Sequence, residues 1–225
     1  MFGTHDPALF AFTVLVLNAT PGVDLMLTLT RTLQVGVRAG LAAAAGIVAG
    51  CVIHTLAAAF GLAALLAASG AAFSVVKWAG ALYLVWLAWG MLRTAWHGAL
   101  PRVPTATAAK TGFEPGTGAA RAAPSLGAIF RQGLLTNALN PKVALFFLAL
   151  LPQFIGTDAA NKELAFLFLG AWFVVQGGVF LLLFALCVAP LRRWAAPASA
   201  LRALHAGAAA LFAALAARLA LAERV

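Results

Sequence analysis

Two polar patches interrupt otherwise apolar segments of the sequence, and both contain a proline. The first patch spans residues 18–24 and reads NATPGVD, and the second spans residues 137–142 and reads NALNPK. Proline breaks the helical hydrogen-bond ladder, and within lipid the freed backbone groups are tolerated only when they are buried in protein or line a wet cavity. Interruptions at corresponding positions of two halves are the best sequence indication of a transporter binding site. The patches therefore predict a carrier whose substrate binds between them.

Each patch carries one charged side chain, Asp24 in the first and Lys142 in the second. A charge inside a membrane span costs at least about 2.5–3.5 kcal/mol on insertion scales, so such residues are usually functional. Asp24 fits a proton or cation site better than it fits a helix cap at the membrane edge. Two arrangements of the pair remain open: Asp24 and Lys142 form a salt bridge, or they hold the ammonium and carboxylate of a zwitterion.

His54 continues a stripe of small residues, Ala42, Gly46 and Gly50, along one helix face. Small residues at this spacing let another helix approach closely, so His54 is expected to face protein and not lipid. A packing role for His54 is favoured over proton relay, although histidine titrates near neutral pH. The residues expected at the substrate and proton site are Asn18, Pro21, Gly22, Asp24, His54, Asn137, Asn140, Pro141 and Lys142.

The composition places these patches in a membrane. Hydrophobic residues make up 64% of the 225 residues and charged residues 9%, with a mean hydropathy of +0.98. A soluble domain carries roughly a quarter charged residues. We therefore expect an all-α integral membrane protein with six transmembrane helices, of which the first and fourth are broken at the proline patches. The expected spans are residues 7–30, 40–67, 72–94, 128–155, 163–189 and 199–221.

One long polar stretch, residues 97–127, separates the third expected span from the fourth. Its richness in Ala, Thr, Gly and Pro is typical of a flexible linker. The linker divides the chain into halves at residues 1–96 and 128–225, each with three expected helices. Because three is an odd number, the halves must insert with opposite orientation, and the sequence predicts two inverted three-helix repeats.

Basic residues are distributed unevenly over the two faces of the expected bundle, ten against four. The richer face carries Arg31, Arg38, Arg93, Arg102, Lys110, Arg121, Arg131, Arg192, Arg193 and Arg202, and the other carries Lys77, Lys162, Arg218 and Arg224. Basic loops stay in the cytoplasm, so the linker is expected there and both termini in the periplasm or outside the cell.

Other functions are less well supported by the sequence than a carrier is. The formal net charge of +9 is explained by basic residues beside the spans, so no nucleic-acid partner is expected. Cys51 and Cys187 are far apart and lie in apolar runs, and we expect them to pack and not to bind metal. No cofactor is expected. The alternative transporter exports a metal cation or another small solute, and the metal cation is weakened by the lack of clustered metal ligands. An intramembrane enzyme would need a nucleophile–base pair or a metal-ligand cluster, and the sequence shows neither.

Four motifs in this order resemble the lysine-exporter (LysE/RhtB) family of bacterial amino-acid efflux proteins. They are ATPGVD at residues 19–24, Gly46-x3-Gly50-x3-His54, Lys77-x2-Gly80-Ala81-x-Tyr83-Leu84, and Phe130-x2-Gly133-x3-Asn137-x2-Asn140-Pro141-Lys142 with Pro152-Gln153-Phe154. In the first motif Val23 replaces the second proline of the family's usual PGPD. The resemblance covers nearly the whole chain.

The resemblance implies a secondary active exporter of amino acids or their derivatives in the bacterial inner membrane, not an enzyme. It implies an antiporter driven by the proton gradient, with a small-molecule amino-acid substrate, protons and the lipid bilayer as partners. The small-residue stripes fit either internal packing or a homodimer.

Overall fold

Helices provide the regular structure of the protein. The computed structural model describes residues 2–20, 22–64, 70–97, 124–156, 159–189 and 198–221. Within these ranges no strand occurs, and the only β pairing is one antiparallel bridge between Thr4 and Ile155.

Helical segments cover each of the apolar stretches that the sequence marks. In chain order they are α1 (Pro7–Ala19), α2 (Val23–Gln34), α3 (Val37–Leu56), the π-helical η1 (Ala57–Leu62), α5 (Gly70–His97), α6 (Leu126–Ala138), α7 (Pro141–Leu150), the 3-10 helical η2 (Leu151–Phe154), α8 (Lys162–Val188) and α9 (Ala198–Leu221).

The described residues contain two to four candidate membrane spans. Two helices are long and apolar enough on their own, the continuous α3–η1 helix Val37–Leu62 with 26 residues and α8 with 27. Two further candidates are bent pairs, α1 with α2 at 54° and α6 with α7 at 48°. The protein is therefore a multi-pass membrane protein.

The two bends differ in how the second helix begins. Pro141 is the first residue of α7, where its missing N–H has no helical partner to lose. The Asn140 side chain caps α7 by accepting a hydrogen bond from the Lys142 backbone N–H at 3.0 Å. Gly22 precedes α2 with extended backbone and without a side-chain cap. Pro21, the expected breaker of the first span, lies outside the described residues.

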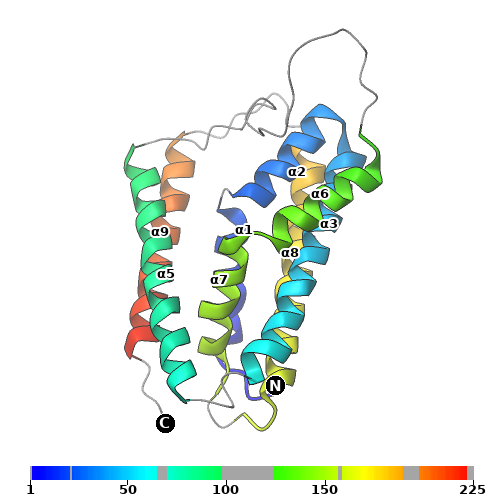
Figure 1. Cartoon of the computed structure of the whole chain (residues 1–225). Helices are drawn as coiled ribbons and strands as arrows, with labels where there is room; N and C mark the ends of the chain where they lie inside the picture. The colour runs from blue at the N-terminus through cyan, green and yellow to red at the C-terminus, as the bar shows by residue number, and fades with distance from the viewer. Residues whose placement is uncertain are drawn as a thin grey trace.

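Figure 1 shows α5 and α9 side by side at one edge of the bundle, with α3, α6 and α8 at the other edge. Helices α1 and α7 run between these two groups. Helix α3 packs on both α6 and α8, whereas α5 packs on α9 and α7. Gly36, with a φ of 119°, makes the turn that joins α2 to α3.

Two glycines explain the close contact between α3 and α6. A Cβ atom at Gly46 would overlap the Phe130 carbonyl oxygen, and one at Gly133 would overlap the Ala43 carbonyl oxygen. Each glycine therefore lets the backbone of the other helix come close, as the small-residue stripe predicts.

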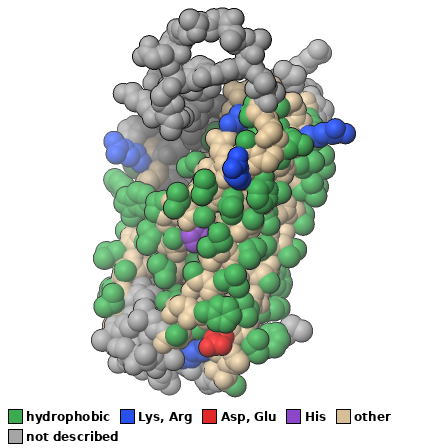
Figure 2. Space-filling model, turned by 45° about the vertical axis from the view of Figure 1, so that its right-hand side comes forward, with side chains coloured by type: hydrophobic (Ala, Val, Ile, Leu, Met, Phe, Trp, Pro, Cys, Tyr) green, Lys and Arg blue, Asp and Glu red, His purple; other side chains and the backbone are tan. Residues whose placement is uncertain are grey.

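Aromatic side chains fill much of the interior, and large apolar side chains also cover the outside. Phe10, Phe146 and Phe212 are fully buried in the main core cluster. Trp86 and Leu82 on α5 are 67% and 68% exposed, which suits contact with lipid. Figure 2 shows hydrophobic side chains over much of the face in view, with Lys and Arg side chains toward the upper end and basic and acidic side chains together near the lower end.

The N-terminal segment is attached to the end of the second bent pair. His5 donates its backbone N–H to the Phe154 carbonyl at 3.0 Å, and Gly156 donates to the Gly3 carbonyl at 2.8 Å. Figure 1 shows α1 beginning and α9 ending at this lower end of the bundle, and α5 ending and α6 beginning at the upper end.

Candidate functional site

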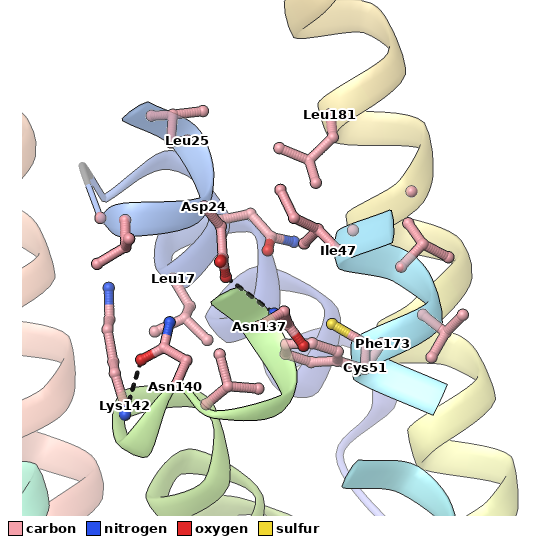
Figure 3. Close-up of a pocket in the computed structure, with 18 of the residues that line it drawn as sticks. Leu17, Asp24, Leu25, Ile47, Cys51, Asn137, Asn140, Lys142, Phe173 and Leu181 are labelled. Carbon is pink, nitrogen blue, oxygen red and sulfur yellow. Dashed lines mark hydrogen bonds between the residues drawn. The ribbon is translucent and has the colours of Figure 1, made fainter. Parts of the chain in front are cut away.

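A cavity of about 60 Å³ lies where the two bends meet, enclosed by residues of α1, α2, α3, α6, α7 and α8. Its walls include Asn18, Gly22, Asp24, Asn137, Asn140 and Lys142. Figure 3 shows Asp24, Asn137, Asn140 and Lys142 gathered in one region of it. The volume holds a few water molecules, at roughly 10–15 Å³ each. Ligand pockets usually measure about 300–1,000 Å³, so the cavity is smaller than a typical ligand pocket.

Asp24 lies in the first turn of α2, beyond the first bend. Its Oδ2 accepts a hydrogen bond from Asn137 Nδ2 at 2.9 Å, which joins two residues 113 positions apart. Its Oδ1 is buried and accepts no hydrogen bond from the residues that the structure describes. A buried acceptor without a partner costs free energy, so a ligand donor would be favourable here.

Asn137 lies next to the last residue of α6 and is 1% exposed. Because a carboxylate only accepts hydrogen bonds, the amide nitrogen must face Asp24, and the amide oxygen then has no partner. The Asn137 backbone carbonyl accepts from the Asn140 backbone N–H at 2.9 Å. Gly50 makes room for this side chain, since a Cβ there would lie 2.7 Å from Asn137 Oδ1.

His54 contacts this group from α3. Its Nε2 lies 3.0 Å from the Asn137 carbonyl oxygen, and its ring packs 5.8 Å from that of Phe147. A carbonyl oxygen only accepts, so Nε2 carries the hydrogen in this contact. His54 faces protein, as the small-residue stripe predicts, and it touches the site's backbone without lining the cavity.

Lys142 follows Pro141 in the first turn of α7. Its ammonium lies beside Gly22, where an added Cβ would be 3.3 Å from Nζ. No salt bridge within 4.0 Å joins Asp24 and Lys142 in the part of the chain that the structure describes. The Tyr83 hydroxyl of α5 donates to the Lys142 carbonyl at 3.0 Å and so fixes the first turn of α7.

Asn18 lies on α1, next to α8. Its Nδ2 is buried without a partner, and a Cβ added at Gly177 would be 3.6 Å from it. Among the expected site residues, Asn18, Gly22, Asp24, Asn137, Asn140 and Lys142 line the cavity. Pro141 begins α7 and is exposed.

The apolar part of the cavity wall was not predicted from the sequence. Ile47 and Val48 of α3 and Phe173 and Leu181 of α8 line the cavity. Such residue types occur on any membrane helix and do not mark a site. On α3, helical periodicity could have placed Ile47 on the same face as Cys51, which also lines the cavity. Cys51 is buried as expected, whereas Cys187 is exposed.

The acidic, histidine and cysteine side chains near the site are dispersed. Within the described ranges no three His, Cys, Asp or Glu side chains come together as metal ligands. Asp24 is the only carboxylate among the residues that line the cavity.

Together these features define a class of protein. Two bent helix pairs in a multi-pass membrane protein meet at a cavity that has polar and charged residues in a largely apolar wall, which is typical of membrane transporters. The LysE type translocator family model matches residues 15–223, and the chain belongs to that family. The family resemblance seen in the motifs is thus confirmed.

Curated relatives agree with this assignment. The chain is 34% identical over 146 residues to a homoserine/homoserine lactone efflux protein of Salmonella typhimurium, covering 65% of this chain and 63% of that protein. It is 32% identical over 149 residues to a leucine efflux protein of Enterobacter sp., covering 66% and 63%. An uncharacterized membrane protein of Vibrio cholerae is 33% identical over 146 residues, covering 65% and 63%. The matches thus span just under two thirds of these relatives' length, and no solved structure matches.

Proposed function

We propose that this protein is a secondary active exporter of amino acids or amino-acid derivatives. The observation that carries the proposal is a set of three buried polar atoms without partners in one cavity wall: Asp24 Oδ1, Asn137 Oδ1 and Asn18 Nδ2. Two of them accept hydrogen bonds and one donates, so a ligand with both donors and acceptors would satisfy them. Relatives named for the efflux of homoserine or homoserine lactone and of leucine point to amino acids and their derivatives as the ligand class.

The substrate ammonium binds at the acceptors. An ammonium has three donors, and Asp24 Oδ1 and Asn137 Oδ1 each offer a free acceptor. The Asp24 negative charge makes this contact stronger than a neutral hydrogen bond. Asn137 keeps the carboxylate oriented through its other amide atom.

The substrate carboxylate binds between Lys142 and the start of α2. The Lys142 ammonium lies beside Gly22, and the N-terminal N–H groups of α2 have no side-chain cap. Helix N-termini attract anions, and broken transporter helices use them in this way. The separation of Asp24 and Lys142 in this conformation favours a zwitterion over a direct salt bridge.

The architecture that fits this site has six transmembrane helices in two inverted three-helix halves, residues 1–96 and 128–225, joined by the 97–127 linker. The spans are α1–α2, α3–η1, α5, α6–α7, α8 and α9. Packing between the halves supports it: α3 of the first half packs on α6 of the second, and α8 of the second packs on α1 and α2 of the first. Rocking of such halves would open the cavity to each side in turn.

Coupling to protons would use the same residues. Among the described residues that line the cavity, Asp24 is the only acidic one, so one group would take up either a proton or the substrate ammonium. Competition for one carboxylate gives antiport, with protons entering as amino acid leaves. The protein would lie in the bacterial inner membrane with both termini outside.

Counterflow in proteoliposomes tests the proposal. Vesicles are loaded with one unlabelled amino acid, and uptake of the labelled compound is followed with and without an imposed pH gradient. We expect uptake of at least one amino acid, stimulated by the gradient and abolished in Asp24→Asn. Folded protein that exchanges none of the amino acids, homoserine or homoserine lactone would contradict the proposal.

A further inference from the structure

The charged groups that line the cavity number two within the described residues, Asp24 and Lys142. Both are used by the proposed backbone pose, one by the substrate ammonium and the other by its carboxylate. A substrate side chain must therefore meet the remaining wall, and this inference rests on the proposed function.

That wall is apolar on three helices. Leu25 of α2, Ile47 of α3 and Leu181 of α8 are 8%, 2% and 7% exposed and pack together in one cluster. Figure 3 shows all three beside Asp24, with Lys142 lying farther from Ile47 and Leu181 in this view. Val48 and Phe173 extend the apolar lining.

Several polar groups near the cavity already have hydrogen-bond partners, and the Asn18 amide is uncharged. Thr20 donates its hydroxyl to the Val16 carbonyl at 2.7 Å, and Asn140 Oδ1 caps α7. Gln176 of α8 donates to the Ala11 carbonyl at 2.7 Å and accepts from Trp172. A charged substrate side chain would find no opposite charge to replace the one on Asp24 or Lys142.

We propose that this wall makes the site selective for amino acids with uncharged aliphatic side chains and excludes basic and acidic ones. An unpaired charge moved from water into an apolar wall is strongly disfavoured. A change of one methylene in an apolar pocket alters the specificity constant by only about 10–200-fold. Neutral aliphatic side chains of different size should therefore differ in specificity constant, and none should be excluded.

A carboxylate placed in the wall tests the inference by gain of function. Val48 is half-buried and lies against Gly178, with 3.4 Å between a Cβ at Gly178 and Val48 Cγ2, so it tolerates exchange better than Ile47. Val48→Asp supplies a partner for a lysine side chain, and Val48→Asn is the matched control with similar shape and no charge.

The measurement is competition by leucine, alanine, lysine and glutamate against counterflow in proteoliposomes. For the wild type we expect leucine and alanine to compete at concentrations at least about 100-fold lower than lysine or glutamate. Val48→Asp should raise the lysine-to-leucine preference at least tenfold, and Val48→Asn should not.

Wild-type competition by lysine or glutamate within about threefold of leucine would overturn the selectivity while leaving amino-acid export standing. Counterflow of no amino acid by folded protein would instead overturn the proposed function itself. If Val48→Asp does not reach the membrane, the wild-type ratio alone decides.

Discussion

The side-chain amide of Asn137 connects the two bends of the molecule. Its nitrogen donates to Asp24 beyond the first bend, while its own backbone lies at the second. The amide oxygen is buried and has no hydrogen-bond partner among the described residues. One residue thus orients the carboxylate and offers an acceptor of its own, so both substrate affinity and stability should depend on it.

Asn137→Ala should weaken substrate binding at least tenfold and lower the free energy of unfolding by about 1–3 kcal/mol, because Asp24 loses a charge-assisted hydrogen bond. Asn161→Ala is the matched control. It removes the α8 cap, an acceptor for the Leu164 N–H at 2.9 Å, and should cost about 0.5–2 kcal/mol without changing affinity. Binding titrations and thermal unfolding in detergent measure both effects. Equal affinity losses in the two variants would show that Asn137 acts through stability alone.

His54→Ala should lower transport less than tenfold. The Asn137 carbonyl that His54 contacts also accepts from the Asn140 N–H, so it keeps a partner when the imidazole is removed. Initial rates of export driven by a pH gradient measure the effect. Complete loss of gradient-driven export, with counterflow intact, would assign proton transfer to His54 instead.

The site depends on how closely helices α3 and α6 approach each other. Gly46 and Gly133 permit backbone contact between the two helices, and Gly50 leaves room for Asn137. The helix that carries the second bend is thereby held against the helix that carries His54.

Gly46→Ala should destabilise the protein by about 1–3 kcal/mol, because the added Cβ meets a backbone carbonyl that cannot rotate away. Gly90→Ala on α5 is the control, since nothing lies within 4 Å of its added Cβ. Alanine is favoured over glycine inside a helix by about 0.5–1 kcal/mol, so the control should be neutral or stabilising. Thermal unfolding of both variants checks this, and equal shifts would argue against the close approach of α3 and α6.

The helices could be predicted well from the sequence, because apolar runs of membrane length dominate it. The second expected span, 40–67, corresponds to a helix over Val37–Leu62, and the fifth, 163–189, to Lys162–Val188. Helix boundaries differ from the expected ones where a capping residue sets the start of the helix. Asn161, for example, accepts a hydrogen bond from the Leu164 N–H, and the cap starts α8 at Lys162.

The site was predictable only in part. Paired prolines and rare charges singled out Asp24 and Lys142, since such residues are costly in lipid. The Tyr83 contact to the Lys142 carbonyl depends on the packing of α5 against α7, which no local pattern reveals. The apolar wall was missed because Ile47 and Leu181 resemble lipid-facing residues in type.

Different contacts hold the helices together at the two ends of the bundle. Figure 1 shows α2 and α6 toward its upper end. Arg31 of α2 donates to Gln132 Oε1 of α6 through Nε at 3.1 Å, which ties together two helices that carry the bends. At the lower end the N-terminal segment pairs with residues 154–156. From the basic bias of the sequence we propose that the upper end faces the cytoplasm.

Cysteine labelling in intact cells tests this orientation. In a Cys51→Ser, Cys187→Ser background, Phe2→Cys should react with an impermeant thiol reagent, and Pro124→Cys should react only after the membrane is opened. Both positions are exposed. The reverse pattern would invert the orientation.

If one zwitterion binds across the two bends, its ammonium and its carboxylate should each depend on one residue. The measurement is the affinity of leucine, isoamylamine and isocaproate for the wild type, Asp24→Asn and Lys142→Gln. Isoamylamine lacks the carboxylate of leucine, and isocaproate lacks its ammonium. In the wild type each loss should weaken binding at least tenfold, as expected for a charge-assisted contact of about 1.5–3 kcal/mol. Loss of the ammonium should matter little in Asp24→Asn, and loss of the carboxylate should matter little in Lys142→Gln, because contacting groups are not additive. Strictly additive losses in both cycles would contradict the shared site.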